Sequence, residues 1–203
     1  MLRSYLIRAG STDKVLRPFS RLGLSPNSWT VLALALAFIG AAALAVHQLA
    51  QGLVLFVLSG FLDMVDGAVA RERNLSSARG AFLDGVLDRY VELLLFLGLM
   101  AYIGEGASYL SIRAEYWMLL LTFGALMTSF VRAYADHRGL VVDAEELRRM
   151  GGLLERAERL LLLYIGMALG LFRPDWLLAM IALAALLSNA TVLQRMAYAL
   201  SKG

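Results

Sequence analysis

Long apolar runs separated by short polar links are the main pattern along this chain. Each run is close to the roughly 20 residues that an α-helix needs to cross the hydrocarbon core of a bilayer. The pattern predicts an all-α, polytopic membrane protein with six transmembrane helices, which form one bundle over residues 27–198. The expected spans are residues 27–48, 51–71, 81–103, 115–135, 153–172 and 175–198.

The segment before the first apolar run has a different pattern. Its apolar residues at positions 2, 5, 6 and 9 fall on one helical stripe, with Arg and Lys between them. This spacing predicts an amphipathic helix that lies on the membrane surface within residues 1–24. A plain solvated tail is the alternative. Ser25-Pro26-Asn27 then breaks the segment before the first span.

Basic residues indicate which side of the membrane each link occupies. Most of them lie before the first span, between the second and third, between the fourth and fifth, and at the C-terminus. The other three links hold only Arg113 and Arg173. Because basic residues gather on the cytoplasmic side, both termini are expected to be cytoplasmic. We therefore expect a multi-pass protein of the cell membrane.

Composition narrows the classes of function. With 60% hydrophobic and only 17% charged residues, the chain is neither disordered nor typical of a soluble domain. Its net charge of +3 fits attraction to the anionic lipid bilayer, and we expect no nucleic-acid partner. The absence of Cys excludes disulfides and thiolate metal sites.

Four aspartates interrupt the apolar pattern. Asp63 and Asp66 are three residues apart in the second span, and Asp84 and Asp88 are four apart in the third. Each spacing puts both carboxylates on one helix face. Because the link is short, the two helices should pack antiparallel with these ends together. A carboxylate within a span costs roughly 2.5–3.5 kcal/mol on insertion scales, so a purely structural role explains four of them poorly.

Divalent cations would offset this negative charge. A site made only of carboxylates suits Mg²⁺, Mn²⁺ or Ca²⁺, whereas zinc prefers His or Cys. Two such cations bridged by carboxylates indicate chemistry on a phosphate or pyrophosphate. Gly67, Ala70 and Gly80 are small residues beside the aspartates and leave room for a ligand near the backbone. Helix packing is the alternative role for such small residues.

A divalent-cation or proton transporter is an alternative of a different class, because intramembrane carboxylates also mark ion paths. The acidic residues, however, gather at one membrane boundary, with no second set to carry an ion outward. The two halves of the chain also lack the matched broken helices of inverted repeats. The sequence therefore favours an enzyme.

The same residues form a signature, which reads Asp63-x2-Asp66-Gly67-x2-Ala70-Arg71-x8-Gly80-x3-Asp84-x3-Asp88. In every specified position it resembles the signature of the CDP-alcohol phosphotransferases, and the six-span layout and N-terminal helix are similar as well. The resemblance implies an enzyme that transfers the phosphatidyl or archaetidyl group of a CDP-linked lipid to an alcohol and releases CMP. It also implies a homodimer.

The resemblance implies a role for each residue of the signature. The four aspartates would bind two Mg²⁺ or Mn²⁺ ions per active site, and Asp88 would also act as general base on the acceptor hydroxyl. Gly67, Ala70 and Gly80 would line the cytidine pocket. Arg71 would contact the pyrophosphate of the CDP-linked lipid.

The acceptor alcohol is indicated by segments around the later spans. They are similar to the branch of the family that uses inositol phosphate, the phosphatidylinositol-phosphate and archaetidylinositol-phosphate synthases. In that branch, basic residues matching Arg132, Arg156 and Arg195 bind the phosphate of the acceptor. All three are predicted near cytoplasmic ends of different spans, where guanidinium groups suit a phosphate. Anchoring by positive charge is the alternative role for them, and glycerol 3-phosphate is the alternative acceptor.

Overall fold

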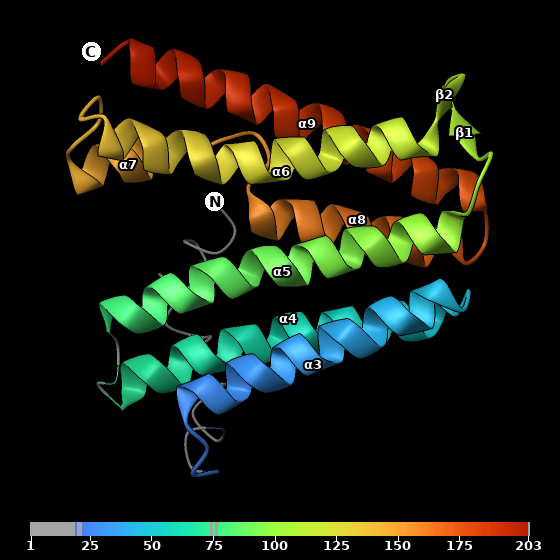
Figure 1. The fold of residues 1–203 in the computed structure, drawn as a ribbon, viewed down its shortest axis with the longest axis horizontal. Helices are drawn as coiled ribbons and strands as arrows, with labels where there is room; N and C mark the ends of the chain where they lie inside the picture. The colour runs from blue at the N-terminus through green and yellow to red at the C-terminus, as the bar shows by residue number, and fades with distance from the viewer. Residues whose placement is uncertain (1–18, 20–21, 74, 76, 203) are drawn as a thin grey trace. The chain divides into compact units, whose positions relative to one another are not determined.

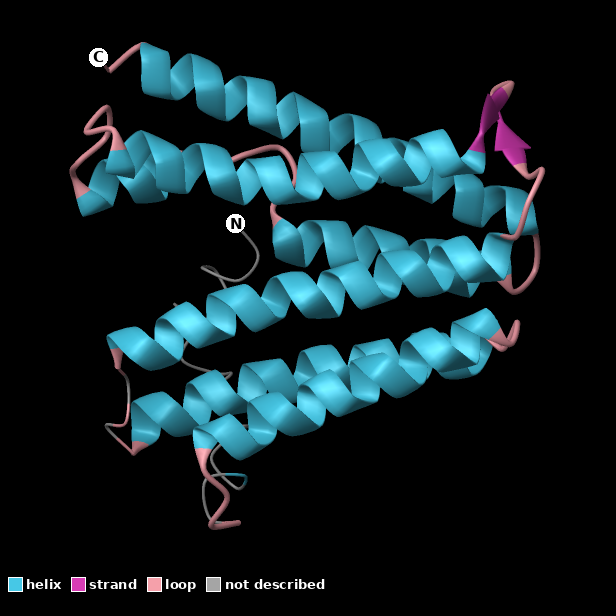
Figure 2. Ribbon diagram, in the orientation of Figure 1, coloured by secondary structure: helices cyan, strands magenta, loops and turns pink. Residues whose placement is uncertain are grey.

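The fold is taken from a computed structural model, which describes residues 19, 22–73, 75 and 77–202. The amphipathic helix expected within residues 1–24 lies almost entirely outside this described part. Within it the chain is helical apart from loops and one short hairpin, as Figures 1 and 2 show, which confirms the all-α prediction. The chain separates into two compact units, residues 2–104 and residues 105–203.

The described residues of the unit 2–104 form three long helices: α3 (Pro26–Ala45), α4 (Leu49–Glu72) and α5 (Ala78–Ile103). The start of α3 follows the predicted break, because Ser25 caps it and Pro26 takes the first helical position. The Ser25 hydroxyl accepts a hydrogen bond of 3.2 Å from the backbone N–H of Ser28. α5 starts in the same way after Ser77, whose hydroxyl accepts from the N–H of Gly80 at 3.1 Å.

α3 packs against both α4 and α5, because glycines on those helices allow a close approach. A Cβ atom added to Gly52 of α4 would lie 2.5 Å from Cδ2 of Leu44. One added to Gly98 of α5 would lie 2.9 Å from Cδ1 of the same leucine. The hydroxyl of Ser59 in α4 donates to the carbonyl of Ala33 in α3 at 2.7 Å and adds a polar contact between the helices.

The unit of residues 105–203 contains four helices and a hairpin of two short antiparallel strands. These elements are β1 (Ser108–Tyr109), β2 (Ile112–Arg113), α6 (Ala114–His137), α7 (Ala144–Arg149), α8 (Arg156–Gly170) and α9 (Pro174–Leu200). α9 packs against α6 and α8. A Cβ atom on Gly166 of α8 would lie 2.7 Å from Cβ of Met180 in α9, so this glycine serves helix packing. The side-chain amide of Asn189 in α9 donates to the carbonyl of Leu120 in α6 at 2.9 Å.

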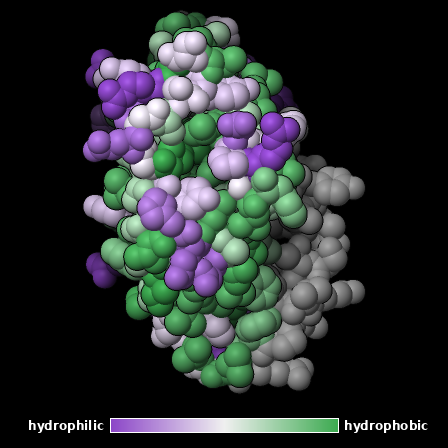
Figure 3. Space-filling view, turned by 90° about the vertical axis from the view of Figure 1, so that its right-hand side faces the viewer, coloured by the Kyte–Doolittle hydropathy of each residue, from purple (hydrophilic) through white to green (hydrophobic). Residues whose placement is uncertain are grey.

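Within the described residues, four helices are long and apolar enough to cross a membrane: α3, α4, α6 and α9. The other two predicted spans are different. α5 carries four charged residues between positions 84 and 92: Asp84, Asp88, Arg89 and Glu92. α8 starts at Arg156 and has 15 residues, which span about 22 Å against a hydrocarbon core of about 30 Å. Large apolar side chains cover much of the surface, as on the face shown in Figure 3, which fits a multi-pass membrane protein.

Candidate metal and phosphate sites

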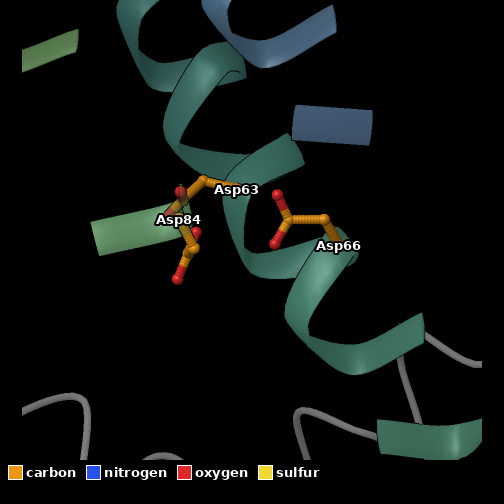
Figure 4. Close-up of side chains that lie close together, drawn as sticks. All are labelled: Asp63, Asp66 and Asp84. Carbon is orange, nitrogen blue, oxygen red and sulfur yellow. The ribbon is translucent and has the colours of Figure 1, made fainter. Parts of the chain in front are cut away.

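Three of the four aspartates lie together where the C-terminal part of α4 meets the start of α5 (Figure 4). Asp63 and Asp66 come from α4, and Asp84 comes from the second turn of α5. One carboxylate oxygen from each lies within 4.8 Å of the others. The two helices run in opposite directions, as Figure 1 shows, so the prediction that these helix ends lie together is confirmed.

The donor set fits a hard divalent cation. Opposite oxygens on Mg²⁺ lie about 4.2 Å apart, at about 2.1 Å for each metal–oxygen bond. Oxygens already within 4.8 Å of one another can therefore close on such an ion with small side-chain movements. Only carboxylates make up the group, which suits Mg²⁺ or Mn²⁺ and not zinc.

Asp66 is positioned by α3, the helix that packs on α4. Its Oδ2 accepts a hydrogen bond of 2.7 Å from Oγ1 of Thr30, and its side chain is buried. Asp63 and Asp84 are half-buried. The hydrogen bond from Thr30 fixes the orientation of the Asp66 carboxylate, as hydrogen-bond partners of metal ligands commonly do. Sequence reasoning gave Thr30 no part in the site, although a hydroxyl near the start of an apolar helix was a usable signal.

Asp88 lies one turn further along α5 and is not within the group of three carboxylates. Its side chain is buried, and its Oδ2 lies 3.9 Å from Nη2 of Arg89. Nη1 of Arg89 in turn lies 3.7 Å from Oε2 of Glu92, which is also buried. Asp84, Asp88 and Glu92 therefore form a stripe of acidic residues along α5, of which Glu92 was not anticipated.

The four residues expected to bind CDP lie on the same two helix ends. Gly67, Ala70 and Arg71 follow Asp66 on α4, and Gly80 lies in the first turn of α5. A Cβ atom on Gly67 would lie 3.3 Å from Nη1 of Arg71, so the guanidinium lies over this glycine. No atom of another described helix comes within 4 Å of that position. Gly67 therefore leaves room for a polar group and does not serve helix packing.

The three arginines expected to bind the acceptor all belong to residues 105–203. Arg132 is on α6, Arg156 is the first residue of α8, and Arg195 is on α9. Arg132 and Arg195 are close enough for their charges to repel, and so are Arg195 and Arg159 of α8. Arg159 is fully buried, and sequence reasoning did not include it.

Arg195 is buried and held by three acceptors. Its Nε donates to the carbonyl of Gly151 at 3.3 Å, and its Nη1 donates to the carbonyl of Thr128. Its Nη2 donates to Oε1 of Glu155 at 3.3 Å. Arg195 therefore joins α6, α9 and the segment before α8, a structural contribution that its position in the sequence did not indicate.

The sequence profile of the CDP-alcohol phosphatidyltransferase family matches residues 24–194. The chain belongs to this family, which confirms the resemblance found in the signature. Its members are enzymes that transfer a substituted phosphate group, and membership therefore sets the transporter alternative aside.

Individual relatives are more specific. The archaetidylinositol phosphate synthase of Methanothermobacter thermautotrophicus is 34% identical over 180 residues, which cover 88% of this chain and 84% of the relative. The phosphatidylinositol phosphate synthase of Mycolicibacterium smegmatis is 35% identical over 205 residues, which cover 96% and 88% of the two chains.

Solved structures of the Mycobacterium tuberculosis phosphatidylinositol phosphate synthase have the same fold. The crystal structure with CDP-DAG bound has a TM-score of 0.77 and 28% identity, and the match covers 93% of this chain and 92% of that one. The structure in complex with manganese and citrate also has a TM-score of 0.77 and 28% identity, and covers 94% and 89%.

Proposed function

We propose that this protein transfers the phosphatidyl or archaetidyl group of a CDP-linked lipid to a hydroxyl of inositol phosphate and releases CMP. The observation that carries the proposal is the group of Asp63, Asp66 and Asp84, whose carboxylates lie within 4.8 Å of one another at their places in the family signature. Relatives named archaetidylinositol phosphate synthase and phosphatidylinositol phosphate synthase support the choice of acceptor. So does the related synthase solved with CDP-DAG. The reaction is a step of membrane phospholipid synthesis.

The aspartates are proposed to share two tasks. Asp63, Asp66 and Asp84, together with Asp88, would hold two Mg²⁺ or Mn²⁺ ions, which would supply charge stabilisation for the phosphates and for the departing CMP. Asp88 is also the general base and takes the proton of the acceptor hydroxyl. The freed oxygen bonds to the lipid-side phosphorus, and the bond from this phosphorus to the bridging oxygen of CMP breaks. Thr30 keeps Asp66 oriented throughout.

The CDP group is proposed to lie beside the ends of α4 and α5. Arg71 contacts the pyrophosphate, and its guanidinium over Gly67 provides a positive charge one helical turn from the aspartates. Gly67, Ala70 and Gly80 line the cytidine pocket. Because no other helix among the described residues comes within 4 Å of a Cβ atom on Gly67, its small size is available for the ligand.

The acceptor's phosphate is proposed to bind Arg132, Arg156 and Arg195. Like charges from separate helices repel one another, and a dianionic phosphate offsets that repulsion. Guanidinium groups also bind phosphate oxygens through paired N–H donors. The same contacts suit glycerol 3-phosphate, so the acceptor is decided by experiment.

The membrane arrangement is proposed to have six spans within a single domain over residues 1–203. α5 and α8 act as the two additional spans beside α3, α4, α6 and α9. Both termini and the active site face the cytoplasm, following the positions of the basic residues. The protein lies in the cell membrane and forms a homodimer.

A panel of acceptors tests the proposal. Membranes that contain the protein are incubated with radiolabelled CDP-lipid and inositol phosphate, glycerol 3-phosphate, inositol or serine. Labelled lipid product and CMP are expected with inositol phosphate and Mg²⁺ or Mn²⁺, and EDTA should stop the reaction. Product from glycerol 3-phosphate alone would reassign the acceptor, and turnover in EDTA would remove the metal from the mechanism.

A further inference from the structure

Glu155 precedes α8 as its N-cap residue, yet it does not do what an N-cap side chain normally does. Asp, Asn, Ser and Thr are preferred there because their short side chains reach the free N–H groups of the first turn. The Glu155 side chain makes no such bond. Its Oε1 instead accepts from Nη2 of Arg195, a residue 40 positions away on α9. A departure from a local rule in favour of a distant contact is typical of functional sites.

The segment before Glu155 is fixed to α9 at two positions, one helical turn apart. Arg195 donates to the carbonyl of Gly151, and Oγ1 of Thr191 accepts from the N–H of Leu154 at 2.9 Å. A Cβ atom on Gly152 would collide with the side chain of Thr191, so the segment lies directly on the helix. Glu155 is thus held in place beside Arg195 by the backbone that leads to it.

The three acceptors occupy three of the N–H donors of Arg195. A guanidinium has five N–H donors, and one on each nitrogen is used by Gly151, Thr128 and Glu155. The other two N–H donors belong to the two terminal nitrogens, and two such donors can bind two phosphate oxygens. Two of the acceptors are backbone carbonyls, whereas Glu155 supplies the charged one, on the Nη2 side.

We propose that Glu155 is a positioning residue for the phosphate of the acceptor, a phosphomonoester. Its carboxylate holds the Nη2 side of Arg195, so that the terminal N–H pair is oriented before the acceptor arrives. The inference rests on the proposed function, in which Arg195 binds that phosphate. The negative charge of Glu155 itself repels a phosphate, so its contribution comes from the hydrogen bond and not from the charge.

Two variants of Glu155 separate the hydrogen bond from the charge. Glu155→Gln keeps an oxygen that can accept from Arg195, and Glu155→Ala removes it. With the full chain in detergent and inorganic phosphate as the probe, Glu155→Ala should raise the Kd about tenfold, as expected for a lost hydrogen bond to a charged group. For Glu155→Gln, the Kd for phosphate should stay within about twofold of the wild-type value. In turnover, Glu155→Ala should raise the KM for the acceptor and leave kcat and the KM for the CDP-lipid unchanged.

Glu145→Ala is the matched control. Glu145 pairs with Arg149 at 2.9 Å in the same unit, and both side chains are 69% exposed. Its removal should therefore change neither the Kd for phosphate nor the KM for the acceptor. Tighter phosphate binding by both Glu155 variants would overturn the proposal, since Glu155 would then only repel the ligand. Equal increases in KM for both substrates would also overturn it, because they indicate a general fold defect. Phosphate binding that depends on Glu155, without product from inositol phosphate, would instead keep the positioning role and reject the proposed acceptor.

Discussion

Replacing Asp84 by Asn should stabilise the metal-free protein. The carboxylates of Asp63, Asp66 and Asp84 lie within 4.8 Å of one another, and two unit charges at that distance repel by about 3.5 kcal/mol at an effective dielectric constant of about 20. Asp84→Asn removes two of the three repulsions, which together amount to about 7 kcal/mol. The gain in stability should be smaller than this sum, because a proton taken up by the wild-type cluster already relieves part of the repulsion. The variant should therefore unfold at a higher temperature than the wild type when no metal is present.

Metal should narrow that difference, because it stabilises the wild type more than the variant. A cation at 100 times its Kd stabilises a protein by about 2.7 kcal/mol. For a chain of this size the corresponding rise in Tm is roughly 5–11 °C. Asp84→Asn removes one of the four proposed carboxylate ligands, so most of this rise should be lost. The assay is thermal unfolding of the purified protein in detergent, first in EDTA and then with increasing Mn²⁺ or Mg²⁺.

Asp175→Asn is the control for a change of one charge. Asp175 is 80% exposed and lies 4.0 Å from Arg173, so its replacement should leave both melting temperatures unchanged. An Asp84→Asn protein that melts below the wild type in EDTA would refute the estimate of repulsion. One that keeps the full metal-dependent rise would refute the assignment of Asp84 as a ligand.

Three further substitutions test other parts of the structure. Thr30→Val removes the hydrogen bond to Asp66 and should weaken metal binding about 10-fold or more, measured by titration of Mn²⁺. Asp88→Asn should abolish CMP release while leaving the unfolding temperature in place, because it removes the proposed general base. Gly98→Val should lower stability by about 1–3 kcal/mol, measured by denaturant unfolding, because a Cβ atom there meets Leu44 of α3.

Each of these substitutions has its own control or contrary outcome. Thr30→Ser keeps the hydroxyl and should bind metal like the wild type. An equal loss of metal affinity in Thr30→Val and Thr30→Ser would contradict the role of the hydrogen bond to Asp66. CMP release by Asp88→Asn at the wild-type rate would exclude Asp88 as the base. Gly85→Ala controls for the helix effect at Gly98, because a Cβ atom on Gly85 meets nothing within 4 Å.

Local spacing made the acidic cluster predictable. Asp63 and Asp66 share a face because they are three residues apart on one helix, and the short link brings Asp84 to them. The same reasoning placed Asp88 with the other three aspartates. Asp88, however, lies four residues beyond Asp84, and four residues advance a helix by about 6 Å. That advance is larger than the 4.8 Å that joins the three carboxylates, so Asp88 shares their face without belonging to the group.

Contacts between distant residues could not be predicted in this way. Thr30 and Asp66 are 36 positions apart, and Glu155 and Arg195 are 40 apart. Each pair is set by how helices pack, and nothing in the local pattern of either residue specifies its partner. The start of α8 shows the same limit. Hydropathy predicted a helix from residue 153, whereas bonds from α9 hold the preceding segment out of the helix until Arg156.

The two units gather charges of opposite sign, which supports the proposal that one chain binds both a cation and an anion. Residues 2–104 bring three carboxylates together, and residues 105–203 bring Arg132 and Arg159 near Arg195. Gathering like charges in an apolar protein costs free energy that neutral residues at the same positions would not require. Bound ions of the opposite sign offset that cost only while they are present. We therefore expect the carboxylates to select for a divalent cation and the arginines to select for a phosphate, and removal of either ligand should leave the corresponding unit less stable than its neutralised variant.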